Sequence, residues 1–193
     1  MNAPDLPRIT LRVIEVFDLL QIPYRIGGSL ASSALGVPRA TLDADLVADL
    51  RLPHAEPLAT ALQSDFYVSV AMIREAVRGC GSFNLLHLAS GFKVDVFVLK
   101  NRAFDRQAFA RVVLRAWPDE HDPPVAFSTA EDILLHKLEW YRLGDEISDR
   151  HWRDIVGVIR VQSDRLDRDY LHKWSVELRV ADLLDRAFEE AAM

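Results

Sequence analysis

The chain has 193 residues, of which 50% are hydrophobic, 27% are charged and 9% are aromatic. This is the composition of an ordinary globular protein and is too apolar for a disordered chain. Lys and Arg number 23 and Asp and Glu number 29, so the formal net charge is −6. No global basic footprint therefore indicates DNA or RNA binding, although a local basic patch would still allow it.

The single cysteine, Cys80, excludes an intrachain disulfide and a cysteine-rich zinc site, and it fits a reducing, cytoplasmic setting. The segment 1–22 has neither a basic start nor a long apolar core, so we expect no signal peptide. No apolar run approaches the length of a membrane span, and we therefore expect no membrane partner.

The first half of the chain alternates predicted helices and strands. Helical spacing of apolar residues, period-two alternation and Gly or Pro punctuation define these elements. They are a helix at 8–21, a strand at 24–26, a short helix at 30–35, a strand at 41–49, a helix at 53–64, a strand at 66–70, a helix at 71–77, strands at 82–88 and 92–99, and a helix at 104–117.

The character of the sequence changes after an acidic, Pro-rich segment at 118–127, which we interpret as a linker. From Ser128 onward there is little β signal, and Ser128 to Glu131 form a capping-box pattern before an apolar run. The sequence therefore predicts an α/β (α+β) domain at 1–117, with a small mixed sheet and helices packed on one face, and a C-terminal helical bundle at 128–193. The helices of that bundle are expected at 129–143, 149–162, 167–175 and 177–191.

Two carboxylates share one face of the strand predicted at 41–49. Because side chains alternate between the two faces of a strand, Asp43 and Asp45 point the same way, opposite a wholly apolar face. Carboxylates so placed repel each other unless a cation lies between them or water solvates both. The pattern predicts a cation site, with two solvated surface carboxylates as the alternative.

A third carboxylate, Asp95, interrupts the apolar strand predicted at 92–99. It joins Asp43 and Asp45 if the two strands are neighbours in one sheet. Three converging carboxylates suit Mg²⁺, and two such ions can activate an attacking oxygen and stabilise the leaving one. The alternative is an edge-strand Asp95 paired with Lys93 or with an arginine.

A glycine turn precedes the Asp-x-Asp strand. Gly27 and Gly28 let the backbone approach a ligand closely, because they lack a Cβ atom. Ser29 then begins a short helix, whose free N–H groups can hold a phosphate. Strand, turn, short helix and Asp-x-Asp strand together can hold a metal-bound triphosphate, although a tight turn with a helix cap explains the same residues.

These motifs resemble the nucleotidyltransferase superfamily with the DNA-polymerase-beta-like fold. The resemblance covers roughly the first hundred residues and is closest to small bacterial members, including those of abortive-infection and toxin–antitoxin systems and some antibiotic-modifying ones. It implies catalytic and metal-binding roles for the three aspartates, the third of which assists the attacking hydroxyl, and it implies that the glycine turn holds the nucleotide phosphates. The residues that carry it are Gly27, Gly28, Ser29, Asp43, Asp45 and Asp95.

The C-terminal half has a fainter similarity to the helical part of the toxin-like members, over 131–138 and 148–155. There a helical lysine and a downstream aspartate commonly face the nucleotide pocket, which implies nucleotide binding by Lys137 and Asp154. Those members often have a Lys-Asp pair where this chain has Arg153-Asp154. Arg39, between the glycine turn and the Asp-x-Asp strand, is either a phosphate contact or a surface charge.

More ordinary roles exist for the residues of the C-terminal half. Lys137 can lie on a solvated helix face or pair with Glu131 or Asp132, and Asp154 has Arg150 and Arg153 as helix partners. Aromatic residues at helical spacing are expected in the core between helices rather than as a platform for base stacking. These are Trp140, Tyr141 and Trp152.

The sequence thus predicts a Mg²⁺-dependent nucleotidyltransferase, with one or two ions, that takes an NTP such as ATP as substrate. It moves an NMP onto an acceptor hydroxyl of a protein, a small molecule or an RNA 3′ end, and the acidic balance favours the first two. The alternative is a non-catalytic protein that keeps the fold, binding a nucleotide or acting as the partner in a toxin–antitoxin pair. A third reading treats the resemblance as accidental and the carboxylates as surface residues.

Overall fold

The computed structural model describes residues 5–192, which form two compact units. Unit 1 contains the chain up to Gly27 together with Thr41–Phe127, and unit 2 contains Gly28–Ala40 and the chain from Ser128 onward. The segment 28–40, predicted within the N-terminal domain, therefore belongs to the helical unit. None of the helices described is both long and apolar enough to cross a membrane.

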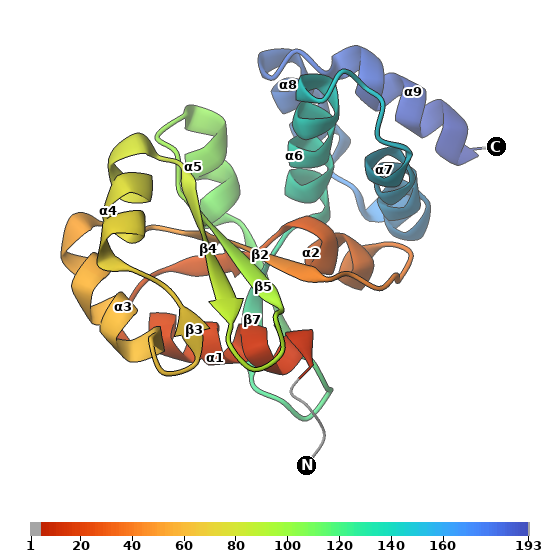
Figure 1. The fold of residues 1–193 in the computed structure, drawn as a ribbon. Helices are drawn as coiled ribbons and strands as arrows, with labels where there is room; N and C mark the ends of the chain where they lie inside the picture. Colours follow the sequence, from red (N-terminus) through yellow and green to blue (C-terminus); the bar gives the residue numbers. More distant parts are fainter. Residues whose placement is uncertain (1–4, 193) are drawn as a thin grey trace. The chain divides into compact units, whose positions relative to one another are not determined.

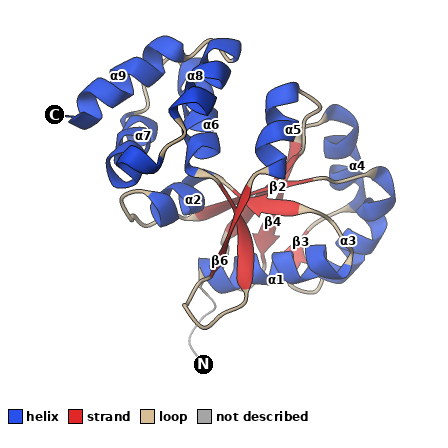
Figure 2. Cartoon of the chain, turned by 180° about the vertical axis from the view of Figure 1, so that it is seen from behind, coloured by secondary structure: helices blue, strands red, loops and turns tan. Residues whose placement is uncertain are grey.

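Unit 1 is a mixed α/β unit built on one sheet (Figures 1 and 2). Within the described residues the sheet has seven strands, in the order β3-β4-β5-β2-β1-β7-β6. Strands β2 and β5, and β1 and β7, pair in parallel, whereas β1 with β2, β3 with β4, and β4 with β5 are antiparallel. The elements are α1 (Leu6–Leu19), β1 (Tyr24–Ile26), β2 (Asp43–Ala48), a 3₁₀ turn (Leu52–His54), α3 (Ala55–Leu62), β3 (Phe66–Tyr67), α4 (Val70–Gly79), β4 (Ser82–His87), β5 (Lys93–Val98), α5 (Ala103–Ala110), β6 (Val112–Ala116) and β7 (Pro124–Ser128).

The central strands have one buried apolar face, as their alternating sequence predicts. Helix α1 contacts β2, and α4 contacts β4 and β5. The opposite face is partly covered as well, because Arg25 of β1 shares it and lies 5.8 Å from the ring of Phe109 on α5. Helices therefore lie on both faces, not on one. The buried side chains of this core include Val13, Phe17, Leu46, Leu58, Leu62, Phe66, Leu85, Val94 and Val96.

The segment predicted as one helix at 104–117 is instead α5 followed by the strand β6. The helix ends at Ala110, and the backbone of the next residue, Arg111, is extended. The β-branched pair Val112 and Val113 favours a strand there. Because β6 is an edge strand, exposed along most of its length, it lacks the period-two alternation that would have revealed it. The segment interpreted as a linker at 118–127 also carries most of β7.

Unit 2 is helical. It consists of α2 (Gly28–Leu35), α6 (Ala130–Leu143), α7 (Asp149–Gln162), a 3₁₀ turn (Ser163–Arg165), α8 (Arg168–Glu177) and α9 (Ala181–Ala192). Hydroxyl or carboxylate side chains cap three of these helices, because Thr129, Ser148 and Asp167 each accept an N–H from the first turn. The predicted cap at Ser128 is thus shifted by one residue. The core includes Leu134, Leu138, Ile155, Val158, Leu171 and Leu184.

Candidate functional site

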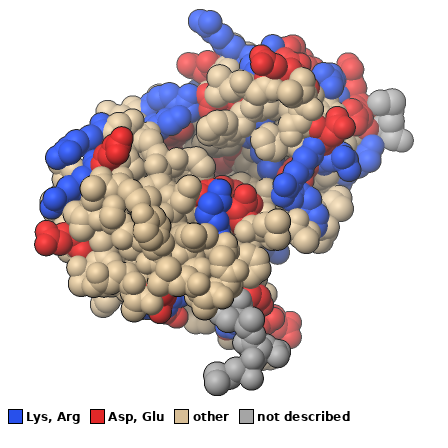
Figure 3. All heavy atoms as spheres, in the orientation of Figure 1, with Lys and Arg blue, Asp and Glu red and all other residues tan. Residues whose placement is uncertain are grey.

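The three aspartates lie on one face of the sheet in unit 1. Strands β2 and β5 are neighbours, as predicted, and Asp45 is the register partner of Asp95 in a parallel pair. Asp43 lies one step along the same face, opposite Lys93. The alternation places all of these residues on the half-buried face, whereas the neighbouring positions on both strands are buried and apolar. Space-filling atoms show a small group of acidic and basic side chains on a mainly uncharged surface over β4 and β5 (Figure 3).

Asp43 and Asp95 each interact with one neighbouring side chain. Thr41 donates its hydroxyl to Asp43 Oδ1 over 2.8 Å, and Lys93 Nζ lies 2.8 Å from Asp95 Oδ2. The hydrogen bond to Asp95 raises the pKa of Lys93, burial lowers it, and the charges of Asp95, Asp43 and Asp45 each raise it by a smaller amount. The charges of all three carboxylates therefore stabilise the positive charge of Lys93.

The second carboxylate oxygen of Asp95, Oδ1, lies in a different environment. Asp95 Oδ1 is buried and has no hydrogen-bond partner among the described residues. A buried carboxylate oxygen without a donor is costly, and a cation or a donated hydrogen would remove that cost. The unpaired oxygen of Asp95 therefore favours a ligand that brings a positive charge or a hydroxyl donor.

The possible metal ligands on this face fit magnesium only in part. The three aspartates offer carboxylate oxygens, which Mg²⁺ prefers. However, no group of three or more His, Cys, Asp or Glu side chains within residues 5–192 is arranged to hold a metal ion. Magnesium is commonly bound by one or two carboxylates and completed by substrate phosphates and water. Asp43 and Asp45 would hold it in that way, and the residues fit an ion that arrives with a phosphate-bearing substrate.

The first residue of the glycine turn, Gly27, is hydrogen-bonded to the backbone of Asp45. The N–H of Gly27 donates to the backbone oxygen of Asp45 over 2.9 Å. The next residue, Gly28, has a φ of 52°, in the left-handed region that favours glycine. The chain therefore turns sharply beside the middle of β2, and Ser29 follows in the first turn of α2. This is the glycine turn that the sequence predicts.

A buried polar cluster in unit 2 is centred on Asp154 of α7. Arg39 binds its carboxylate through both oxygens, with Nε to Oδ1 at 2.7 Å and Nη2 to Oδ2 at 2.8 Å. Lys137 Nζ lies 2.8 Å from Oδ2, and Arg39 Nη2 also donates to Ser29 Oγ over 2.8 Å. The side chains of Asp154 and Lys137 are only 7% and 8% exposed. Four of the predicted nucleotide-binding residues thus meet within one unit.

The charges in this cluster are fixed at neutral pH. Burial would raise the pKa of Asp154, but hydrogen bonds from Arg39 and Lys137 and their charges lower it to about 2. Burial lowers the pKa of the neighbouring His151, with Lys137 acting in the same direction and Asp154 against it. With His151 neutral, two cations face one carboxylate, and the four side chains carry a net charge of +1. This arrangement can attract a phosphate.

Comparisons with solved structures identify the fold. The solution structure of the antibiotic-resistance factor ANT(2'')-Ia matches 94% of this chain and 95% of its own length, with a TM-score of 0.55 and 13% identity. An antigenic nucleotidyltransferase-like protein from Paracoccidioides brasiliensis matches 93% of this chain and 91% of its own, with a TM-score of 0.54 and 19% identity. ANT(2'')-Ia in complex with adenylyl-2''-tobramycin gives a TM-score of 0.50 at 15% identity, over 89% of this chain and 95% of its own.

The chain has the nucleotidyltransferase fold. The likeness covers nearly the whole chain and thus extends beyond the first hundred residues that carry the sequence resemblance. No protein-family model matches the sequence, and a search of curated proteins gives no match. The similarity to this fold therefore lies in the course of the backbone and in a few motif residues, because overall sequence identity is low.

Within this nucleotidyltransferase fold, the predicted residues fall into two groups, one in each unit. Asp43, Asp45, Asp95 and Gly27 belong to unit 1, and Gly28, Ser29, Arg39, Lys137 and Asp154 belong to unit 2. Sequence reasoning did not assign Thr41 to the site and treated Lys93 only as an ordinary ion-pair partner. The period-two rule places Lys93 on the same face as Asp95, since the two residues are two positions apart, but the rule by itself assigns Lys93 no role in the site.

Several ordinary roles considered for the helical residues are wrong. Lys137 is buried rather than solvated, and its Nζ lies 2.8 Å from Asp154 Oδ2. Asp154 binds Arg39, 115 residues away in sequence, and Lys137, rather than its helix neighbours. Ion pairs between helices depend on packing that sequence spacing does not encode.

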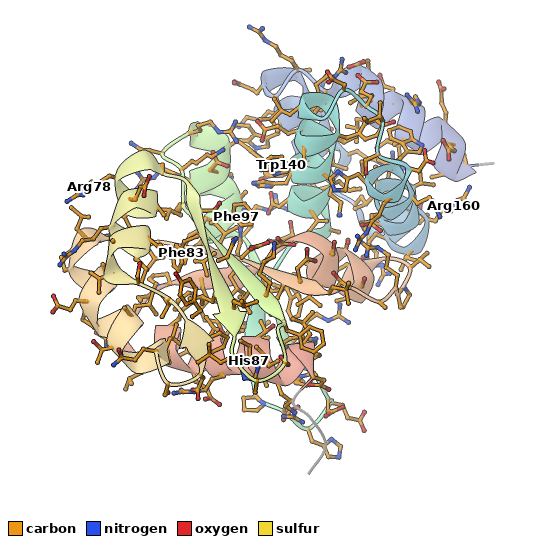
Figure 4. All side chains as sticks on the ribbon, in the orientation of Figure 1. Arg78, Phe83, His87, Phe97, Trp140 and Arg160 are labelled. Carbon is orange, nitrogen blue, oxygen red and sulfur yellow. The ribbon has the colours of Figure 1, made fainter. Side chains whose placement is uncertain are left out.

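The aromatic residues of unit 2 have different environments. Tyr141 and Trp152 are buried with ring centroids 5.2 Å apart, as expected of a core between helices. Trp140 is 50% exposed, so its placement in the core is wrong. Figure 4 shows Trp140 on the side of α6 away from α7. Neighbouring helix positions point about 100° apart, which is why Trp140 leaves the core that Tyr141 enters.

Proposed function

We propose that the protein is a Mg²⁺-dependent nucleotidyltransferase that moves an NMP from an NTP onto an acceptor hydroxyl. The observation that carries this proposal is the register pairing of Asp45 with Asp95 beside the glycine turn at Gly27. Asp43 and Asp45 would hold the metal. When bound, magnesium would neutralise phosphate charge and orient the phosphate that is attacked.

The reaction that these residues would support is a displacement at the α-phosphorus of the nucleotide. The acceptor oxygen forms a bond to that phosphorus, the bond to the oxygen bridging to the β-phosphate breaks, and pyrophosphate leaves with the electron pair. Asp95 Oδ1, buried and without a hydrogen-bond partner in the described chain, would accept the proton of the acceptor hydroxyl. Most of the catalysis would come from positioning and charge neutralisation.

The residues of unit 2 would bind the nucleotide phosphates. Arg39, Lys137 and Ser29 place two cations and a hydroxyl by the first turn of α2, whose N–H groups also favour anions. Asp154 would keep Arg39 and Lys137 in place rather than meet the nucleotide. The two groups are adjacent along the chain, since Gly28 follows Gly27 directly and Arg39 precedes Asp43 by four residues.

The acceptor that we propose is a hydroxyl on a small molecule or a protein. A similar fold is solved with adenylyl-2''-tobramycin, so a small-molecule hydroxyl is one acceptor class that this fold serves. The net charge of −6 disfavours long contacts with an RNA acceptor. A role in a toxin–antitoxin pair and a cytoplasmic location stay predictions of the sequence.

A second candidate function is nucleotide binding without transfer. Two observations favour it: no group of three metal-binding side chains is assembled in the described chain, and Lys93 already occupies one oxygen of Asp95. The same fold could then serve a sensor, or a partner that recognises nucleotide. In such a protein, metal would not strengthen nucleotide binding.

Thermal unfolding with each of the four NTPs, with and without Mg²⁺, tests the proposal. A ligand that binds only the folded state raises its stability by RT ln(1 + [L]/Kd). A Mg²⁺-dependent rise in Tm that is lost in Asp43→Asn/Asp45→Asn supports the metal–triphosphate site and identifies the donor for an acceptor screen. A rise that is independent of Mg²⁺ and present in the double variant supports the second candidate, and no rise with any NTP contradicts both.

A further inference from the structure

The sheet face that carries the three aspartates changes character from strand to strand. Its charged side chains lie on β5, β2 and β1, because Lys93 and Asp95 of β5, the two aspartates of β2 and Arg25 of β1 share this face. The next strands in the sheet are β4 and β3, and the sequence has no Asp, Glu, Lys or Arg from Gly79 to Phe92. The face is therefore divided into a charged half and an uncharged half.

The uncharged half lies directly beside Asp95. Asn84 of β4 is the register partner of Asp95, and Leu86 is the register partner of Lys93. Tyr67 of β3 is in turn paired with Leu86. Because register partners share a face, these side chains continue the face outward from Asp95, on the side away from β2. We call Tyr67, Asn84 and Leu86 the β3–β4 surface.

The β3–β4 surface is open to solvent, unlike the opposite face of the same strands. Tyr67 is 62% exposed and Leu86 is 42% exposed, and Asn84 is exposed as well. Their chain neighbours Phe66 and Leu85 are 1% and 0% exposed. Figure 3 shows the mainly uncharged surface over β4 and β5 around the small charged group. A ligand that covers the tyrosine ring and the leucine would remove apolar area from water.

The size and the charge of this surface fit a small, uncharged ligand. Neighbouring strands are about 4.8 Å apart, so the strand of Tyr67 lies about 10 Å from the strand of Asp95, a distance that two linked rings span. A protein partner covers about 800 Å² of each surface in a stable complex, far more than three side chains provide. An RNA end needs Lys or Arg for its phosphates, and β3 and β4 carry neither.

We propose that the β3–β4 surface binds the acceptor, and that the acceptor is an uncharged molecule of two linked rings, one apolar and one bearing hydroxyl groups. The apolar ring lies on Tyr67 and Leu86. Asn84 binds a hydroxyl that does not react, since an amide, like a hydroxyl, both donates and accepts hydrogen bonds. The reacting hydroxyl meets Asp95. This inference rests on the proposed function, because Asp95 receives the proton in that reaction, and it narrows the acceptor to a neutral small molecule.

Three probes of similar size that differ in charge test the inference. They are phenyl β-D-glucoside, which is neutral, phenyl β-D-glucuronide, which is anionic, and phenyl β-D-glucosaminide, which is cationic in slightly acidic buffer. Each is titrated into the chain with Mg²⁺ and a non-hydrolysable NTP analogue, whose own binding is first measured by calorimetry, and NMR follows the leucine methyl groups and the asparagine side-chain amides. We expect the neutral probe to shift the signals of Leu86 and Asn84. It should bind at least about fivefold more tightly than either charged probe, because a charge desolvated against an uncharged surface is not compensated.

Three variants and a matched control locate the site. Tyr67→Ala and Leu86→Ala each remove apolar contact area and should weaken binding of phenyl β-D-glucoside at least about threefold, and both positions are exposed, so the chain stays folded. Asn84→Asp places an acid on the surface and should shift the preference to the cationic probe. Leu52→Ala is the control, since Leu52 is 44% exposed but lies in the 3₁₀ turn after β2, and it should leave the affinity unchanged.

The outcomes separate this inference from the proposed function. No shift with any probe, tighter binding of a charged probe to the wild type, or unchanged affinity in both alanine variants would overturn the acceptor surface and leave nucleotidyl transfer standing. Shifts of the Leu86 signals with protein concentration alone would show a second copy of the chain there and would overturn it as well. If the calorimetry shows no binding of the analogue, the proposed function itself fails, and the inference fails with it.

Discussion

Asp45 and Asp95 are register partners on the neighbouring parallel strands β2 and β5, on the half-buried face of the sheet. In a sheet, such partners are close enough for like charges to repel. Each aspartate occupies a position where a β-branched side chain would add packing, so stability alone does not explain the pair. Lys93 offsets part of the charge of Asp95, and a ligand that brings further positive charge would stabilise the pair.

Asp45→Asn should abolish nucleotidyl transfer without unfolding the chain. The amide keeps the size of the side chain but removes one of the repelling charges and a metal-binding oxygen. Incorporation of label from an α-labelled NTP measures transfer, and urea unfolding measures stability. Asp49→Asn is the matched control, since Asp49 follows the same strand and pairs with Arg51. Unchanged turnover in Asp45→Asn would contradict the mechanism.

Asp154 should make the free energy of unfolding depend on pH in the acid range. Its folded-state pKa of about 2 lies below the ordinary value of 3.8, so its stabilisation is present above about pH 4 and is lost as the pH falls towards 2. The difference between a pKa of 3.8 and one of about 2 corresponds to about 2.5 kcal/mol. The free energy of unfolding of the wild type minus that of Asp154→Asn should therefore shrink across this window. A difference that is constant from pH 6 to the acid limit would show that the carboxylate is not held by Arg39 and Lys137.

The strands that carry the carboxylates were predictable because a half-buried strand repeats every two residues. In β2 and β5 this alternation is complete, and it fixed which face Asp43, Asp45 and Asp95 share. Strand β6 is exposed along most of its length, so Val112 and Val113 show no such alternation, and the sequence predicts a helix there instead. The short-range pattern was read correctly where burial imposes it and misread where burial is absent.

The cluster around Asp154 was only half predictable. Its members were singled out by resemblance, but their mutual contacts join residues as far apart as Arg39 and Asp154. Such pairs arise from the packing of α2 against α6 and α7, which no local spacing encodes. The same limit applies to the assignment of 28–40 to the helical unit, since contacts rather than chain order decide it.

Lys137→Met should weaken NTP binding and cost about 1–3 kcal/mol of stability without unfolding the chain. Lys137 is 8% exposed and donates to a buried carboxylate, so its loss affects the fold as well as the nucleotide. The chain survives because Arg39 still binds both oxygens of Asp154. Calorimetry with an NTP and urea unfolding measure the two effects. Lys173→Met, on an exposed position of α8 where the ammonium lies over the ring of Trp174, should leave nucleotide affinity unchanged. Nucleotide affinity equal to that of the wild type would remove Lys137 from the site.

Two tryptophans in unit 2 should respond differently to the same substitution. Trp152 is buried, stacks near Tyr141 and donates from Nε1 to Glu190 Oε2 over 2.7 Å, so Trp152→Leu should cost about 3 kcal/mol. Trp140, on the exposed side of α6, should lose less than about 1 kcal/mol in Trp140→Leu, because half of its surface is already in water. Urea unfolding of the two variants compares them directly. Equal losses would mean that Trp140 is packed in solution, and the core of unit 2 would then extend across both faces of α6.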